Sequence, residues 1–85
     1  MTQSLTLNIG YGEVVVARRI VAIISYTSAP MKRMKDDAKK DNRLIDATRG
    51  RKTRSVIIMD SRHVILSAMH VETISHRFKA LEKSD

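Results

Sequence analysis

The densest basic cluster in the chain is RGRKTR at residues 49–54, where four of six residues are basic and none is acidic. Arginine offers a planar fork of N–H donors that matches phosphate oxygens and guanine edges, while lysine offers a point charge. Gly50 allows a left-handed backbone and a close approach to phosphate. Like charges on one turn repel each other and add little to folding, so the cluster predicts a polyanion site; an ordinary solvated turn is the alternative. The candidate contacts are Arg49, Arg51, Lys52 and Arg54.

Arg18 and Arg19 form a second candidate site, because they interrupt the apolar, largely β-branched run of residues 14–24. Neighbouring side chains along a strand point to opposite faces. One arginine would then face solvent or a ligand, and the other would pair with an acid across a subunit contact. The basic residues at 32–40 are weaker candidates, since Asp36 and Asp37 lie at i,i+4 spacing from several of them and compensate their charge.

The positive charge is concentrated in the middle of the sequence. The chain has 85 residues, with 16 Lys+Arg, 9 Asp+Glu and a formal charge of +7. Residues 18–62 hold thirteen of these bases and five of the acids, a net charge of +8. This placement, with 42% apolar residues, excludes a disordered basic tail. The absence of cysteine excludes disulfides, thiolate metal sites and cysteine nucleophiles, and it suits a reducing cytosol.

The remaining patterns do not indicate catalysis. GYG at residues 10–12 begins like a dinucleotide-binding fingerprint, but Val15 occupies the third glycine position and the following segment has a strand pattern. The three histidines are seven and six residues apart, unlike the i,i+4 spacing of helical metal ligands. Ser61 lies with an aspartate and a histidine in a predicted hairpin tip, which is turn chemistry. We therefore predict no enzyme, no cofactor, no metal site and no small-molecule substrate.

The aromatic content bears on which nucleic acid the basic cluster would bind. Only Tyr11, Tyr26 and Phe78 are aromatic, whereas single strands are usually held by several aromatic platforms among basic residues. The sequence thus favours duplex DNA held by its backbone. An RNA-binding or ribosome-associated module and a protein-only oligomeric scaffold remain as alternatives. The longest apolar stretch, residues 14–24, is too short and too charged to span a membrane, so we expect a soluble cytoplasmic protein with no membrane partner.

The hydrophobic pattern predicts the elements that position these residues. It indicates one small α+β domain over residues 1–85, with a core of about 5–80 and the order βββ-α-βββ-α on a mostly antiparallel sheet with two helices. The two runs that flank the arginine pair could be separate strands or one bent strand. RGRKTR would lie at a hairpin tip. The predicted strands are 5–9, 14–17, 20–24, 44–47, 53–59 and 63–68, and the predicted helices are 30–42 and 71–83.

Residues 56–59 and 64–66 are apolar at successive positions, so both faces of these predicted strands need cover. Two modest helices would hardly cover two faces, which suggests burial against other copies of the chain. The alternative is that the helices divide between the two faces and cover both.

Several segments together resemble the RemA-type extracellular matrix regulatory proteins, small bacterial DNA-binding proteins. They are LNIGYGE, ARRIVAI, SAPMKRM, LIDATRGRKTRSVIIMDSRHVILSA and the last helix, within residues 5–80. The resemblance implies a cytoplasmic, nucleoid-associated transcriptional regulator of biofilm-matrix and related operons. It also implies a ring-shaped homo-oligomer, on the heptamer or octamer scale, whose rim binds duplex DNA in an architectural, wrapping manner.

The resemblance assigns site residues as well. The family's paired basic residues after the turn glycine correspond to Arg51 and Lys52, and its strand arginine corresponds to Arg19. Its neighbour Arg18 is an additional candidate DNA contact, drawn from the arginine pair itself and not from the resemblance. Lys52 stands where members usually have arginine, so a point charge replaces a bidentate donor. Three further departures are Arg49 for a usual Tyr, Arg18 for a usual Asn and Glu13 for a frequent Asn. The two added arginines lead us to expect stronger, more salt-sensitive binding.

Overall fold

A computed structural model describes residues 5–82 and confirms the α+β class and the predicted order of elements. A short 3-10 turn, Ala17–Arg19, separates the second and third strands, which settles that they are two strands. The remaining elements are β1 (Thr6–Gly10), β2 (Glu13–Val16), β3 (Ile20–Ser25), α1 (Ala29–Lys40), β4 (Leu44–Asp46), β5 (Ser55–Met59), β6 (Val64–Ser67) and α2 (Val71–Glu82).

The strands form two sheets, and most of their pairings are antiparallel. β1 and β2 make a hairpin, and the other four strands form a sheet in the order β3-β5-β6-β4. β4 pairs with β6 in parallel, while β5 pairs antiparallel with β3 and β6. Because β6 lies between β4 and β5, residues 47–54 cross the end of the sheet. The prediction of a hairpin tip at RGRKTR is therefore wrong.

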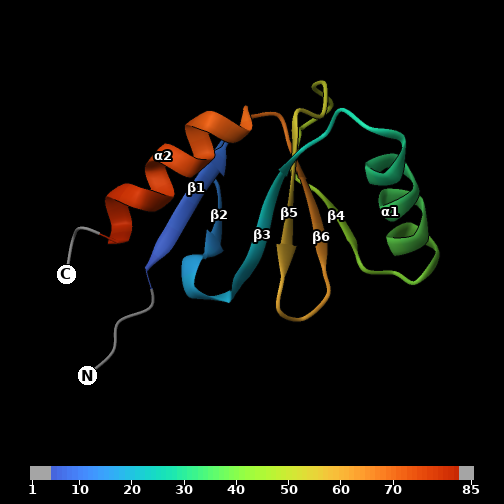
Figure 1. Cartoon of the computed structure of the whole chain (residues 1–85), viewed down its shortest axis with the longest axis horizontal. Helices are drawn as coiled ribbons and strands as arrows, with labels where there is room; N and C mark the ends of the chain where they lie inside the picture. The colour runs from blue at the N-terminus through green and yellow to red at the C-terminus, as the bar shows by residue number, and fades with distance from the viewer. Residues whose placement is uncertain (1–4, 83–85) are drawn as a thin grey trace.

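The four-stranded sheet is covered on both faces by other parts of the same chain (Figure 1). On one face, Ile57 and Ile65 pack against the β1-β2 hairpin and Ile74 of α2. On the other face, alternate residues of β5 and β6 pack against Met34 and Ala38 of α1. β5 and β6 therefore do not need a second copy of the chain for their burial. For these two strands, the alternative prediction that the helices divide between the two faces is confirmed.

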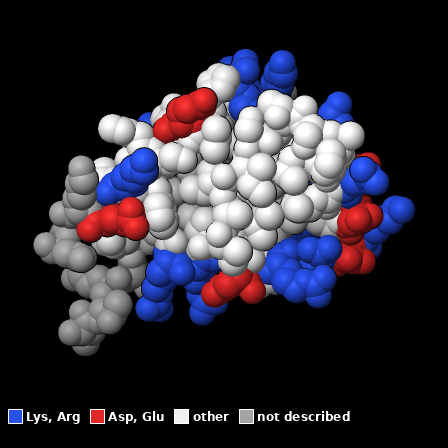
Figure 2. Space-filling model, viewed as in Figure 1, with Lys and Arg blue, Asp and Glu red and all other residues white. Residues whose placement is uncertain are grey.

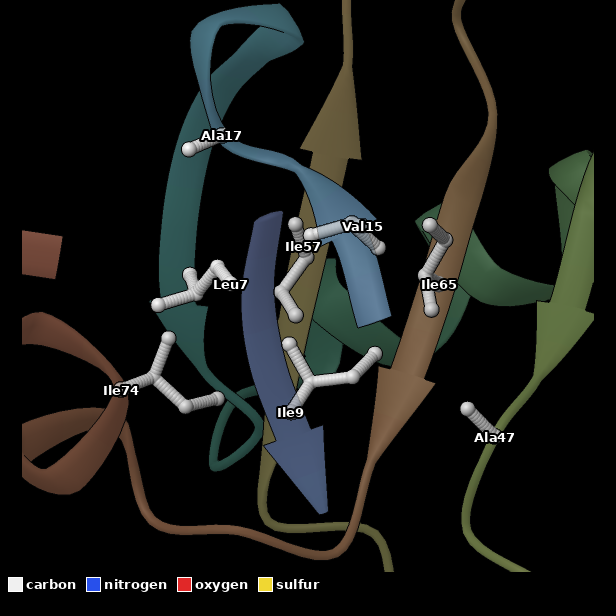
Figure 3. Close-up of a cluster of buried hydrophobic side chains, with 8 residues drawn as sticks. All are labelled: Leu7, Ile9, Val15, Ala17, Ala47, Ile57, Ile65 and Ile74. Atoms are coloured by element: carbon white, nitrogen blue, oxygen red, sulfur yellow. The ribbon is translucent and has the colours of Figure 1, made fainter. Parts of the chain in front are cut away.

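Figure 3 shows the larger apolar cluster, in which side chains from both sheets and α2 point toward one another. Ile57 and Ile74 have no exposed surface, and Leu7 and Ile9 retain 1%. The alternating pattern of residues 5–9 accounts for this, because every second side chain of β1 faces the four-stranded sheet. The cluster is Leu7, Ile9, Val15, Ala17, Ala47, Ile57, Ile65 and Ile74.

Apolar side chains are nevertheless exposed along the strand edges. β2, β3 and β4 each have a described strand neighbour on one side only. Val21 on β3 keeps 66% of its surface accessible, and Val14 on β2 and Ile45 on β4 flank a shallow recess between the two sheets. Unpaired edges with apolar side chains are places where further chains can add. No helix within residues 5–82 is long and apolar enough to cross a membrane.

Candidate nucleic-acid interface

The basic segment is held as a tight turn at the end of the sheet. The Arg51 N–H donates to the Thr48 carbonyl over 3.1 Å, and the two residues between them have left-handed φ angles of 56° at Arg49 and 79° at Gly50. Positive φ at both central positions is typical of a type I′ turn. Gly50 adopts this conformation without strain, whereas Arg49 bears a cost of roughly 1 kcal/mol.

Asp46 fixes the start of this turn. Its Oδ1 accepts the Thr48 backbone N–H over 2.9 Å and the Thr48 hydroxyl over 2.6 Å. These bonds favour the ionised carboxylate, so they lower the pKa of Asp46 below its ordinary value of 3.8, the hydroxyl more than the N–H.

Acidification should therefore loosen the basic turn. A depressed pKa contributes stability that is present above the unfolded-state value of 3.8 and is lost as the pH falls through the lower folded-state value. We expect the Thr48 and Arg49 amide signals in NMR to shift together as Asp46 protonates below pH 3.8. Asp46→Asn should abolish this pH dependence, and an identical profile in the parent and the variant would contradict the assignment.

Three basic side chains of the segment are exposed and have no carboxylate partner. Within residues 5–82, no Asp or Glu oxygen comes within 4.0 Å of the charged nitrogens of Arg51, Lys52 or Arg54. These side chains line a recess of about 390 Å³ together with Tyr11 and Ala68. Basic side chains that are buried and ion-paired usually have a structural role. Exposed positive charge without an acidic partner, placed around a recess, is suited to an anionic ligand.

Tyr11 joins this site from the β1-β2 hairpin. The Arg51 guanidinium carbon lies 4.7 Å from the centre of the Tyr11 ring, within cation–π range. Tyr11 has a left-handed φ of 54° at the hairpin tip and is 48% exposed. Sequence reasoning placed this residue in a turn but did not connect it with Arg51, since the two are forty residues apart in the chain.

Arg49 differs from its neighbours because it has an acidic partner. Its Nε donates to Glu13 Oε2 over 3.1 Å, which links the basic turn to β2. Both groups are largely solvated, so the pair adds little to stability. It does reduce the positive charge that Arg49 offers to a ligand. This pairing counters the expectation that Arg49 adds free positive charge to the turn.

The second candidate pair lies at the opposite end of the sheet. Arg18 and Arg19 are in the 3-10 turn rather than in a strand, so the prediction that they point to opposite faces of a strand is wrong. Arg19 donates to the Asp60 carboxylate of its own chain over 3.2 Å and 3.4 Å, and the Asp60 N–H donates to its carbonyl over 2.8 Å. The acid predicted to lie across a subunit contact is thus supplied within the chain.

Strand β5 separates the two basic regions. It runs from Ser55, next to Arg54, to Met59, next to Asp60, and five residues of strand span roughly 17 Å. Figure 2 shows Lys and Arg along the upper edge of the molecule, where Figure 1 places the β4–β5 connection, and mixed charges along the lower edge. Within one chain, Arg49, Arg51, Lys52 and Arg54 therefore lie together. Arg18 and Arg19 lie apart from them, at the other end of β5.

The β5–β6 hairpin contains a serine–histidine contact. The Ser61 hydroxyl lies 2.7 Å from His63 Nδ1, in an exposed tip. Asp60 binds Arg19 instead of His63, so these three residues are not connected as a Ser-His-Asp triad. Elsewhere in the described chain, no three His, Asp or Glu side chains gather in a way that could hold a metal ion.

The fold and the site define a small α+β domain with an uncompensated basic edge next to an aromatic turn. Residues 6–78 match the RemA-like family, described as extracellular matrix regulatory protein A-like. The chain belongs to this family.

Relatives cover nearly the same span. The chain is 67% identical over 75 residues to a protein from Desulfosudis oleivorans, a match that covers 88% of this chain and 77% of the relative. It is 57% identical over 79 residues to one from Dictyoglomus turgidum, covering 93% of each, and 52% identical over 84 residues to one from Oleidesulfovibrio alaskensis, covering 99% and 100%. Each is named "Putative regulatory protein". The family and these names support a regulatory role rather than an enzymatic one.

Proposed function

We propose that this protein is a DNA-binding transcriptional regulator that holds duplex DNA through the turn at residues 49–54. The observation that carries the proposal is the set of three exposed basic side chains without acidic partners, Arg51, Lys52 and Arg54, around one recess. Contacts of this type neutralise phosphates and release counterions. The family description supports a regulator of extracellular-matrix genes, acting in the cytoplasm on the nucleoid.

A homo-oligomer would convert this weak site into a stable one. Each subunit offers only a few contacts, and a ring of several subunits would repeat them along a curved track for a bent duplex, so that avidity strengthens binding. The unpaired strand edges with exposed Val14, Val21 and Ile45 support association between copies. Arg19 and Arg18, at the other end of the sheet, would then contribute a second basic row, with Arg19 limited by its bond to Asp60.

A salt titration of the unaltered protein tests the proposal. Fluorescence anisotropy with a labelled duplex should show log affinity falling by ~0.9 per phosphate contact per log unit of salt. Sizing with and without the duplex reports assembly in the same samples. Preference for a competing structured RNA would favour the RNA-binding alternative, and binding without salt sensitivity, or none at all, would favour the protein-only scaffold. A persistent monomer that ignores DNA would remove both parts of the proposal.

Glu13→Gln should strengthen duplex binding by roughly three- to tenfold, because it releases Arg49 from its ion pair and adds about one phosphate contact. The salt slope should become steeper by ~0.9. Glu82→Gln, the same chemical change at the exposed end of α2, is the control for net charge and should leave the slope unchanged. Equal effects of the two variants would show that Glu13 does not restrain Arg49.

A further inference from the structure

A second recess borders the Tyr11 turn. It measures about 350 Å³ and is formed by the end of β1, the segment before α2 and one side chain of α2. It shares Tyr11 and Ala68 with the recess lined by Arg51, Lys52 and Arg54, so the two recesses are adjacent at the tyrosine. Its lining residues are Asn8, Gly10, Tyr11, Ala68, Met69 and Arg77, and none carries a negative charge.

Arg77 supplies the positive charge of this second recess. Its NH1 group donates to the Asn8 backbone carbonyl over 3.3 Å, which ties the guanidinium of α2 to β1. An arginine has five N–H donors, so most of them stay available for a ligand. In the part of the chain that the structure describes, no carboxylate oxygen lies within 4.0 Å of the Arg77 guanidinium.

Hydrogen bonds from two buried serines tie together the segments next to the two recesses. The buried Ser67 hydroxyl donates to the Ile9 carbonyl over 2.7 Å, and the Ser55 hydroxyl donates to the Met69 carbonyl over 2.8 Å. These bonds hold the end of β1, and with it the Tyr11 turn, against the segment that leads into α2. The geometry of the two recesses is therefore preorganised, which lowers the cost of ordering them on binding.

The backbone conformation of Tyr11 also favours a ligand contact at this turn. Both central residues of the two-residue hairpin loop, Tyr11 and Gly12, have positive φ angles of 54° and 81°. Asn or Gly would fit the first position with less strain than a tyrosine, which bears a cost of roughly 1 kcal/mol there. The large ring, placed between two basic recesses, suits contact with Arg51 and with a ligand better than it suits the turn.

We infer that Arg77 forms a second phosphate subsite, so that a strand of duplex DNA crosses the Tyr11 turn. One backbone phosphate would lie at Arg51, Lys52 and Arg54, and another at Arg77 in the adjacent recess. This inference rests on the proposed function. It extends the interface from the turn at residues 49–54 onto α2.

Arg77→Ala and Lys79→Ala test the subsite as a matched pair. Both remove one exposed positive charge from α2, but only Arg77 lines the recess. In anisotropy titrations of a labelled duplex, Arg77→Ala should weaken binding about tenfold and lower the salt slope by ~0.9, while Lys79→Ala should keep the parent slope. Equal slopes for the two variants, in a parent that binds duplex with a steep salt dependence, would overturn the subsite and leave the proposed function standing. A parent without that dependence would overturn both.

Tyr11→Asn gives a second readout that separates ligand contact from a structural role. We expect its urea midpoint to stay equal or rise, because asparagine suits a left-handed position, while duplex affinity falls about three- to tenfold. Tyr11→Phe should keep most of the affinity, since the ring face remains. A Tyr11→Asn variant that is less stable and binds DNA like the parent would contradict the placement of Tyr11 between two phosphates.

Discussion

Replacing Arg51 and Lys52 together by alanine should weaken duplex binding roughly a hundredfold for a single subunit. Each charge-assisted contact to phosphate contributes about 1.5 kcal/mol, or about tenfold in affinity. Both side chains are exposed and have no acidic partner within the described residues, so their removal leaves no buried group unpaired and should not disturb the fold. In an oligomer that engages several subunits, the loss multiplies with the number of contacts.

Lys39→Ala with Lys40→Ala is the matched control, because it removes two adjacent positive charges from the exposed last turn of α1. It should reduce affinity far less and keep the salt slope. The Arg51/Lys52 double variant should also keep the elution volume of the parent, which separates binding from assembly. If this variant still shifted duplex DNA like the parent at about 150 mM salt, the site would lie elsewhere on the molecule.

The sequence predicted the elements well because their patterns are local. The alternation at residues 5–9, the stripe that buries Ile74 on α2 and the proline near the start of α1 each determine an element from within a few residues. The position of β4 was not predictable in this way. It has three residues and pairs with β6 rather than with its sequence neighbour β5, and strand pairing across twenty residues depends on tertiary packing.

The basic cluster was found from composition, but its surroundings were not. Charge density identifies Arg51 and Lys52. It does not show that the Tyr11 ring lies against Arg51, that Glu13 pairs with Arg49, or that Arg77 lines a neighbouring recess. A sequence gives no distance between such residues. The same reason explains why the sequence did not show how far Arg19 lies from the cluster: its turn is at the other end of β5.

The apolar pattern of β5 and β6 also shows what a sequence leaves open. Val56 and Ile57 are both buried within one chain, by α1 on one side and by the β1-β2 hairpin on the other. Counting only the two helices as cover underestimated how much of the sheet one chain can bury, because the β1-β2 hairpin packs on one face as a second layer. The case for assembly therefore rests on the exposed strand edges rather than on the central strands.

Ser67→Ala should lower the free energy of unfolding by roughly 2–5 kcal/mol. The Ser67 hydroxyl is fully buried, donates to the Ile9 carbonyl over 2.7 Å and accepts the Met69 N–H over 3.0 Å. Alanine leaves both backbone groups without a partner, and each unsatisfied buried group costs about 1–3 kcal/mol. Against a total stability of about 5–10 kcal/mol for a domain of this size, the loss is large. Urea unfolding followed by circular dichroism measures it.

A graded series of serine variants distinguishes this network from a general effect of removing hydroxyl groups. Ser55 makes one hydrogen bond of the set, to the Met69 carbonyl, so Ser55→Ala should cost about half as much as Ser67→Ala. Ser75→Ala, on the half-buried side of α2, should be neutral or slightly stabilising because alanine favours helix. The same order should appear in duplex affinity measured on fully folded protein, since Ser67 and Ser55 hold the Tyr11 turn and the segment before α2 against each other. Equal losses of stability in all three variants would mean that the serines do not act through these bonds, and the preorganisation of the two recesses would then need another cause.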